Sequence, residues 1–179
     1  MRVNYVELLS SYIAWISDLA VQGSFLDPGN LRVKDVARAR TLAALRMIQP
    51  EHKTILVKFL YEAGMLGSQN GAAAKPIIIL NGADLKGVNL SHYQMEYISI
   101  TSAFLNEANL SGAFLFQANL TACDLINADL SGANLDKANL LMADLTGANL
   151  KAASMLGTTI LDEQLSKAAC TEGLIRSKQ

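Results

Sequence analysis

The chain has 179 residues, of which 51% are hydrophobic and only 6% aromatic, and its formal net charge is −1. This length allows one or two small domains, and a Leu- and Ala-rich composition suits a narrow, repetitive core. With two cysteines and two histidines, neither a disulfide framework nor a metal site is supported, and without a long apolar run no membrane span is expected. We therefore expect a cytoplasmic protein that does not bind nucleic acid directly.

Residues 1–68 are predicted to form an N-terminal helical domain of about three helices. Apolar spacing favours a first helix over about 4–22 and a second over about 33–48, and Pro50 suits the first turn of a third. Gly64 or Gly67 would end that third helix. Residues 69–76, rich in Gly and Ala, are expected to be a linker. The first helix presents a broad apolar side, formed by Tyr5, Leu8, Leu9, Tyr12, Trp15, Ile16 and Leu19.

From residue 77 to residue 161 a five-residue pattern repeats without a break. Seventeen consecutive centres, spaced by five from Leu80 to Ile160, are thirteen leucines together with Met95, Ile100, Met155 and Ile160. A small or apolar residue lies two positions before each centre, most often Ala. A period of five matches neither an α-helix nor an open strand, so the pattern indicates a solenoid whose units stack on one another. Glycines recur two positions after a centre, where a turn with positive φ favours them.

This motif, seen in Ala83-Asp84-Leu85 and Ala133-Asn134-Leu135, resembles the pentapeptide-repeat family. The resemblance implies a right-handed quadrilateral β-helix with four pentads in each coil, and so about four coils over residues 77–161. The fold class would be a mainly β solenoid with α caps. The N-terminal runs 40–46 and 59–64 are similar to the helical segment that precedes the repeats in some bacterial, notably cyanobacterial, members.

Both ends of such a solenoid expose unpaired backbone and leucines, and so both need caps. The N-terminal helices are expected to cap the first coil, or to form a dimerisation unit, because the apolar side of the first helix is broader than a cap requires. Residues 162–179 are expected to form a C-terminal capping helix and a tail. In that segment Asp162 is a plausible N-cap for a helix through about Ala169, with a disordered tail from Arg176.

The sequence shows no catalytic constellation. No acid or cysteine lies at metal-ligand spacing from His52 or His92, no Gly-rich loop has the context of a phosphate site, and no histidine partners a Ser or Thr nucleophile. Cys123 occupies an alanine position of the repeat and is expected to be a core residue. We therefore expect no enzyme activity and no cofactor. The outward Asn and Asp side chains are expected to bind turn backbone.

Large apolar residues at outward positions are the candidate partner contacts. Two other interpretations are that these residues pack against the N-terminal helices or that they have no role. Phe104 lies in the outward column of Asp84, Asp124 and Asp144. One side of the expected square carries Tyr97, Phe114 and Phe116, together with Leu156, and the adjoining side carries Leu141 and Met142. The full candidate set is Tyr97, Phe104, Phe114, Phe116, Leu141 and Met142.

Two functions are in view. The first is a non-catalytic interaction or scaffold protein with an unknown protein partner, and a homodimer through the N-terminal helices is compatible with it. The alternative is a DNA mimic that binds DNA gyrase or topoisomerase, as the resemblance implies for some members. Residues 77–162 carry three basic and eight acidic side chains, a net charge of −5, whereas residues 1–76 carry nine basic and six acidic ones, a net charge of +3.

Overall fold

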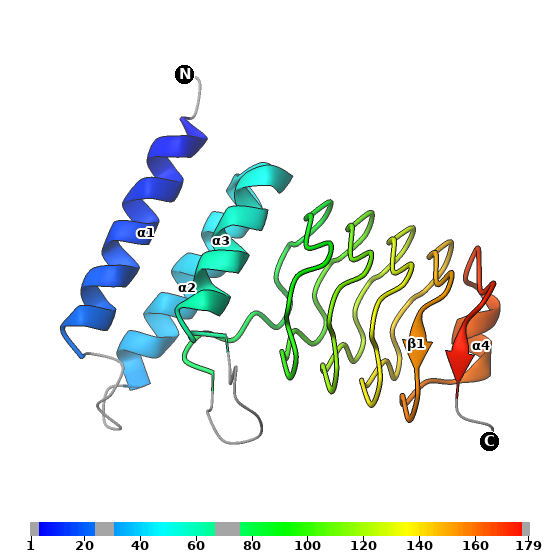
Figure 1. Ribbon diagram of the computed structural model, residues 1–179. Helices are drawn as coiled ribbons and strands as arrows, with labels where there is room; N and C mark the ends of the chain where they lie inside the picture. The colour runs from blue at the N-terminus through cyan, green and yellow to red at the C-terminus, as the bar shows by residue number, and fades with distance from the viewer. Residues whose placement is uncertain (1–3, 24–30, 67–75, 177–179) are drawn as a thin grey trace.

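Three helices form the N-terminal part of the computed structural model, which describes residues 4–23, 31–66 and 76–176 (Figure 1). They are α1 (Tyr5–Val21), α2 (Leu31–Met47) and α3 (Pro50–Glu62), and we call residues 4–66 the helical head. The sequence prediction of three helices is confirmed. The predicted linker over 69–76 lies, apart from Pro76, outside the described residues.

Local signals set the helix ends. The Asn4 side chain accepts a hydrogen bond from the Glu7 amide at 3.3 Å and so caps α1. Pro50 occupies the first turn of α3, where its missing N–H costs nothing. Gly23 and Gly64 follow α1 and α3 with φ of 68° and 69°, a conformation that glycine adopts without steric strain at a helix C-terminus.

The head has a core of its own with one buried polar link. Ile16 of α1, Leu45 of α2 and Leu60 of α3 are all fully buried. The Tyr12 hydroxyl shares a short hydrogen bond with the Thr41 hydroxyl, and Thr41 donates in turn to the Ala37 carbonyl at 2.7 Å. Burial raises the pKa of Tyr12 to about 12. The link satisfies both hydroxyls and joins α1 to α2.

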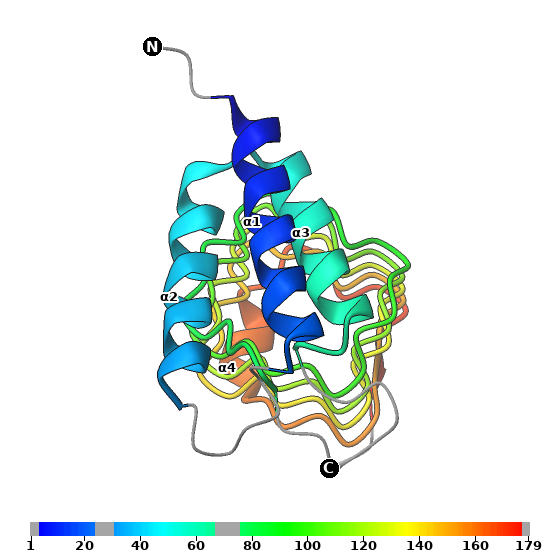
Figure 2. The same cartoon turned by 90° about the vertical axis from the view of Figure 1, so that its left-hand side faces the viewer.

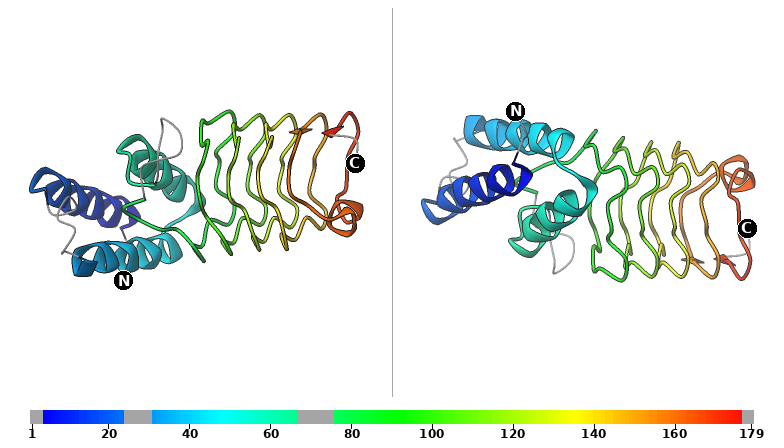
Figure 3. Two further views of the ribbon diagram at one scale, coloured as in Figure 1. Left: turned by 90° about the horizontal axis from the view of Figure 1, so that it is seen from below. Right: turned by 90° about the horizontal axis from the view of Figure 1, so that it is seen from above.

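In residues 77–161, which we call the tower, parallel bridges join residues that lie twenty apart. Examples are Asp84 with Phe104 and Phe104 with Asp124. The Leu85 amide donates to the Phe104 carbonyl at 2.8 Å, and the Phe104 amide donates to the Ala83 carbonyl at 2.9 Å. The bridges form four columns, which pass through residues 84, 89, 94 and 99. The twenty-residue spacing puts four pentads in each turn of the chain. Figures 1 and 3 show these turns stacked on one another.

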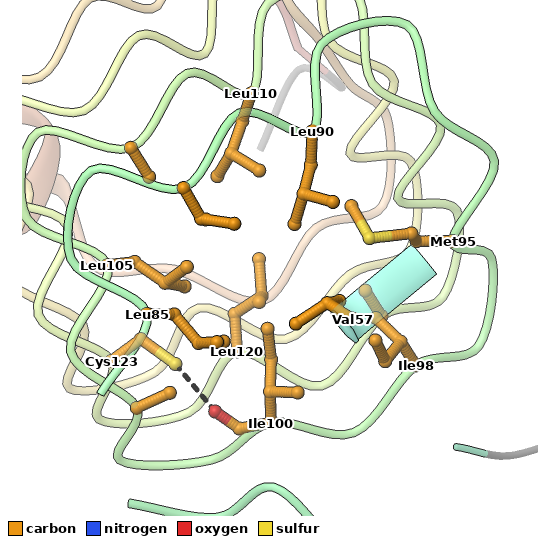
Figure 4. Close-up of a cluster of buried hydrophobic side chains, with 14 of the residues drawn as sticks. Val57, Leu85, Leu90, Met95, Ile98, Ile100, Leu105, Leu110, Leu120 and Cys123 are labelled. Atoms are coloured by element: carbon orange, nitrogen blue, oxygen red, sulfur yellow. Dashed lines mark hydrogen bonds between the residues drawn. The ribbon is translucent and has the colours of Figure 1, made fainter. Parts of the chain in front are cut away.

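The pentad centres fill the interior of the tower. Every centre from Leu80 to Ile160 is buried, and so are most of the residues two positions before them. Each buried leucine contributes about 1.5–3 kcal/mol. Val57 of α3 reaches the same cluster (Figure 4), so one core runs from the head into the tower. Tyr93 and Thr158 depart from the pattern, because both are only half-buried at positions that the repeat predicts to be inward.

For every centre from Leu80 to Met155, the turn residue two positions later is left-handed. Six tower glycines have positive φ there, as predicted, and so do ten residues with side chains: His92, Tyr97, Ser102, Glu107, Gln117, Ala122, Asn127, Lys137, Met142 and Ala152. Left-handed φ costs a residue with a Cβ about 1–2 kcal/mol. The stacked ladder therefore imposes a conformation that local preference opposes at these ten positions.

The first coil is capped mainly by α3, with one contact from α2. Lys53, which is 5% exposed, places its Nζ 2.7 Å from Asp84 Oδ1. Thr54 Oγ1 accepts from the Asn89 amide at 2.9 Å, and Arg38 Nε donates to the Ile79 carbonyl at 3.2 Å. Figures 1 and 2 show α1 on the side of the head away from the tower. Capping and dimerisation are the two roles predicted for the first helix. The first coil is capped mainly by α3 and not by α1.

The C-terminal end departs from the prediction. The helix α4 spans Asp162–Ser166, shorter than the predicted run to Ala169. Asp162 is not its cap. Leu161 holds the cap position, and Gln164 Oε1 accepts from the Leu161 amide at 3.0 Å.

The segment after α4 rejoins the tower. Cys170 bridges Asn149, and β2 (Ile175–Arg176) pairs in parallel with β1 (Ser154–Met155). The register here is twenty-one, because α4 replaces part of a coil, and the five-residue pattern no longer marks the pairing. Arg176, predicted to begin a disordered tail, belongs to a strand and binds Asp162 Oδ1 at 3.0 Å.

The Gln164 side chain replaces the next coil at this end. Its Nε2 donates to the carbonyls of Leu140 at 2.9 Å and Ala143 at 2.6 Å. Elsewhere the alanine carbonyl accepts an amide from the residue twenty-one positions on, as Ala103 does from Asp124. We expect Gln164→Ala to lower the free energy of unfolding by about 1–3 kcal/mol, since buried carbonyls lose their donor. Urea unfolding measures this, with exposed Glu163→Ala as the control, and equal midpoints for the two variants would contradict it.

The left-handed turn gives a second stability prediction. A Cβ at Gly132 would meet no atom within 4 Å, so only its φ of 64° opposes a side chain. We expect Gly132→Ala to destabilise the protein by about 1 kcal/mol and Ala152→Gly, at φ 55°, to stabilise it by up to about 1 kcal/mol. Thermal and urea unfolding of both variants check the pair. A neutral Gly132→Ala would show that the turn is not left-handed in solution.

Candidate protein-binding surface

The wall built on Gln94, Phe114, Asn134 and Ser154, which we call the Phe114 wall, carries the aromatic candidates. These four residues are bridged in sequence, and Phe114 is 41% exposed. The repeat explains why such side chains point outward, since the residue between the inward alanine and the inward leucine must face solvent. The family motif has Asn or Asp at this position, so Phe114 is a departure.

Next to this wall lies the aromatic corner, which consists of Tyr97, Phe116, Lys137 and Leu156. The rings of Tyr97 and Phe116 meet edge to face, with centroids 5.8 Å apart. Lys137 Nζ lies 5.3 Å from the centroid of the Phe116 ring. Leu156 is 43% exposed. The corner thus combines apolar area with one cation, in a row across successive coils.

Asp136 fixes the backbone of this corner. Its Oδ1 accepts from the Ser154 hydroxyl at 2.6 Å and from the Leu156 amide at 2.8 Å, and its own amide donates to Asn134 Oδ1 at 3.0 Å. These bonds hold neighbouring coils at a set spacing. The aromatic corner therefore stands on a tied framework, which reduces the entropy that binding would remove.

The predicted contact residues do not form one surface. Tyr97, Phe114, Phe116 and Leu156 lie together, as predicted. Phe104, 50% exposed, belongs to the column of Asp84, which passes along the opposite wall. Leu141 and Met142 are exposed at a third place, the turn that follows Leu140. The six candidates are thus divided among three parts of the tower.

Tyr93 is a residue that the sequence analysis missed. Its hydroxyl donates to Glu62 Oε1 at 2.6 Å, its ring meets Tyr61 at 5.9 Å between centroids, and Lys58 Nζ lies 4.8 Å above it. Burial raises the pKa of Tyr93 most, and the hydrogen bond to Glu62 and the negative charge of Glu62 raise it further. The signal was present, because a tyrosine stands where the repeat has alanine. It joins α3 to the tower and marks how far the head extends along this wall.

The carboxylates of the tower are engaged locally, as the sequence predicted. Asn and Asp Oδ1 atoms accept the amide two residues on, for example Asp124 from Ile126 at 3.1 Å and Asp129 from Ser131 at 3.0 Å. Hydrogen bonds from the Thr146 hydroxyl and amide lower the pKa of Asp144. Within the described ranges, no group of three or more His, Cys, Asp or Glu could hold a metal ion.

Cys123 is a core residue, as predicted. It is 1% exposed, its Sγ donates to the Ile100 carbonyl at 3.0 Å (Figure 4), and burial raises its pKa to about 11. A thiol of this kind is not a nucleophile at neutral pH.

The raised pKa of Cys123 predicts how the stability of the protein changes in alkaline solution. Since the folded pKa of Cys123, about 11, exceeds the ordinary value of 9.0, its stabilisation is complete below pH 9 and is lost as the pH rises to about 11. The full loss is about 2–3 kcal/mol. We expect Cys123→Ala to be close to neutral at pH 7, where alanine is the usual repeat residue, and to unfold with a weaker pH dependence between 9 and 11. Parallel pH profiles in urea unfolding would contradict this. Tyr12 titrates equally in both proteins and cancels.

The comparisons with known proteins agree with the repeat geometry. The family model "Pentapeptide repeats (8 copies)" matches residues 78–115 and 115–151. The chain belongs to the pentapeptide-repeat family. Pentapeptide-repeat proteins fold as right-handed β-helices and are generally non-catalytic. A search of curated protein sequences finds no significant match.

Several solved structures are similar. A pentapeptide-repeat protein of the Arabidopsis thaliana thylakoid lumen is 30% identical over 53% of this chain and 62% of its own, with a TM-score of 0.45. The pentapeptide-repeat protein Rfr23 of the cyanobacterium Cyanothece 51142 is 32% identical over 62% of this chain and 68% of its own, with a TM-score of 0.35. QnrB1, a plasmid-mediated fluoroquinolone resistance protein, is 15% identical over 57% of this chain and 59% of its own, with a TM-score of 0.36. This chain spans less than two thirds of the Arabidopsis protein and of QnrB1.

No helix within the described ranges is long and apolar enough to cross a membrane.

Proposed function

We propose that this protein is a non-catalytic binding scaffold, in which a right-handed quadrilateral tower of about four coils presents the Phe114 wall and the aromatic corner to a partner protein. One observation carries the proposal. The edge-to-face pair of Tyr97 and Phe116, with Lys137 beside it, lies next to an exposed Phe114, where the repeat motif has small or polar residues. Aromatic side chains are enriched in the cores of protein interfaces.

The helical head does not account for these aromatics. The contacts of α3 with this wall are made at Tyr93, and Phe114 remains 41% exposed one coil further along. Of the interpretations left open by the sequence, cover for the N-terminal helices therefore fits Tyr93 and not Phe114. A partner would have an apolar surface, with an acidic group opposite Lys137.

Affinity purification with the chain as bait, from cells of its native host, tests the proposal. The double variant Phe114→Ser/Phe116→Ser removes both rings from the Phe114 wall and its corner. Phe104→Ser is the control, because it replaces a phenylalanine of comparable exposure, 50% against 41% for Phe114, on the opposite wall. We expect the double variant to retain less than about a tenth of the co-purified partner, as for interface hot spots, and the control to retain it.

Two outcomes oppose the proposal. If the double variant binds as the wild type does, the Phe114 wall is not the contact. If both variants lose the partner equally while their thermal unfolding matches the wild type, binding does not depend on one wall.

A DNA-mimicking binder of DNA gyrase is the alternative function, favoured by the net charge of −5 over residues 77–162. The carboxylates do not form a free array, because Asp84 pairs with Lys53 and Asp124 accepts from Asn106 at 2.6 Å. A gyrase supercoiling assay separates the two functions. Inhibition at micromolar protein that persists in Phe114→Ser/Phe116→Ser would favour the alternative, and no effect would end it.

A cytoplasmic location stays a prediction. The Arabidopsis relative is described as a protein of the thylakoid lumen, and fractionation of the native host would place this one.

A further inference from the structure

An apolar groove runs between α1 and α2, and nothing in the described chain fills it. Two hollows of about 360 and 190 Å³ lie on either side of Trp15. Leu8 and Trp15 on α1 face Arg40 and Met47 on α2 in the first hollow. In the second, Trp15 and Leu19 face Arg32, Val33 and Val36.

The groove exposes apolar side chains to solvent, which does not stabilise a monomer. Val36 and Met47 are 51% and 53% exposed, and Trp15 and Leu19 are only half-buried. The Arg40 guanidinium lies 4.2 Å from the centroid of the Trp15 ring. The groove extends over most of the length of both helices, which is the geometry that accepts another helix.

The two edges of the groove carry opposite charge. At 100° per residue, Glu7 and Asp18 lie on the same side of α1 as Ser11, which lines the first hollow. Arg32 lines the second hollow from α2, and Arg46 and Asp35 lie on the same outer side of that helix, so this edge has a net charge of +1 against −2 on α1. All five charged side chains are exposed, and within the described ranges no ion pair holds any of them.

The register of α1 and α2 sets the heights of these charges. The two helices run in opposite directions (Figure 1), and the Tyr12 hydroxyl contacts the Thr41 hydroxyl. Counted from that contact, Glu7 is level with Arg46, whereas Asp18 is level with Asp35 and about one helical turn from Arg32. The groove therefore has an acidic edge and a net basic edge, with one pair of opposite charges at the same height.

We propose that a second copy of this chain occupies the groove, in a two-fold dimer in which α1 of each copy lies over α2 of the other. A two-fold axis along the helices keeps each residue at its own height and exchanges the two edges. Glu7 of one copy then meets Arg46 of the other, and Asp18 lies within about one turn of the other copy's Arg32. The Trp15 rings come together near the axis, and the apolar side chains of both grooves are buried.

Charge selects this arrangement over the other two-fold one. An axis across the helices would lay α1 over α1, with Glu7 opposite the Asp18 of the other copy and Arg32 opposite its Arg46. Like charges would then meet at both of these pairs, and such contacts oppose association. The inference concerns the head, so it stands or falls separately from the partner contact proposed for the Phe114 wall.

Charge-exchange variants of the full chain test the dimer. One variant carries Glu7→Lys and Asp18→Lys, and the other carries Arg32→Glu and Arg46→Glu. Sedimentation equilibrium of the wild type should give twice the chain mass of 19.2 kDa. Each variant alone places like charges opposite each other and should raise the dimer dissociation constant at least about tenfold. An equimolar mixture restores opposite net charge between the facing edges, and so should give a heterodimer of about wild-type affinity.

Three results would overturn the proposal. They are a wild type that stays monomeric up to about 100 μM, the weak end of specific association, variants that dimerise as the wild type does, and variants that do not associate when mixed. Circular dichroism of each variant keeps a folding defect from being taken for dissociation. Trp15→Ala supplies a second check, because it leaves all charges in place and should also weaken the dimer.

Discussion

The inter-coil backbone ladder is the constraint on which the rest of the structure depends. Each coil donates amides to its neighbours on both sides, so that a pentad has no stable conformation alone and acquires one by stacking. The ladder also overrides local preference, because it holds ten residues with side chains, Tyr97 and Lys137 among them, at left-handed φ. An aromatic or charged side chain at such a turn is fixed by the coils next to it.

The ladder leaves unpaired backbone groups at its two ends. In this protein side chains bind groups that a further coil would otherwise bind. At the first coil, Thr54 Oγ1 accepts the Asn89 amide that has no earlier coil to bind. At the last, Gln164 Nε2 donates to Ala143 where a following backbone amide would. Val57 carries the leucine core into the head. The head and the tower are therefore joined by both polar and apolar contacts.

The sequence predicts the interior of this protein better than its ends and its surface. Five-residue periodicity locates Leu80 to Ile160, the glycine turns and the core role of Cys123, because stacking depends directly on that spacing. It does not reveal that Arg176 returns to the tower, since α4 shifts the register by one residue. It also treats Phe104 and Phe114 as alike, although twenty-residue stacking places them on opposite walls. The contact of Tyr93 with Glu62 needs the position of α3, which the repeat alone does not contain.

If the ladder and the shared core are the basis of stability, the head and the tower unfold as one cooperative unit. Native-state hydrogen exchange measures this most directly, residue by residue. We predict that amides of Leu60 in α3 and Leu120 in the middle of the tower exchange with the same free energy of opening, equal to that of global unfolding. A tower that remains protected while α3 exchanges several kcal/mol sooner would show that the two parts are independent, and would contradict the account.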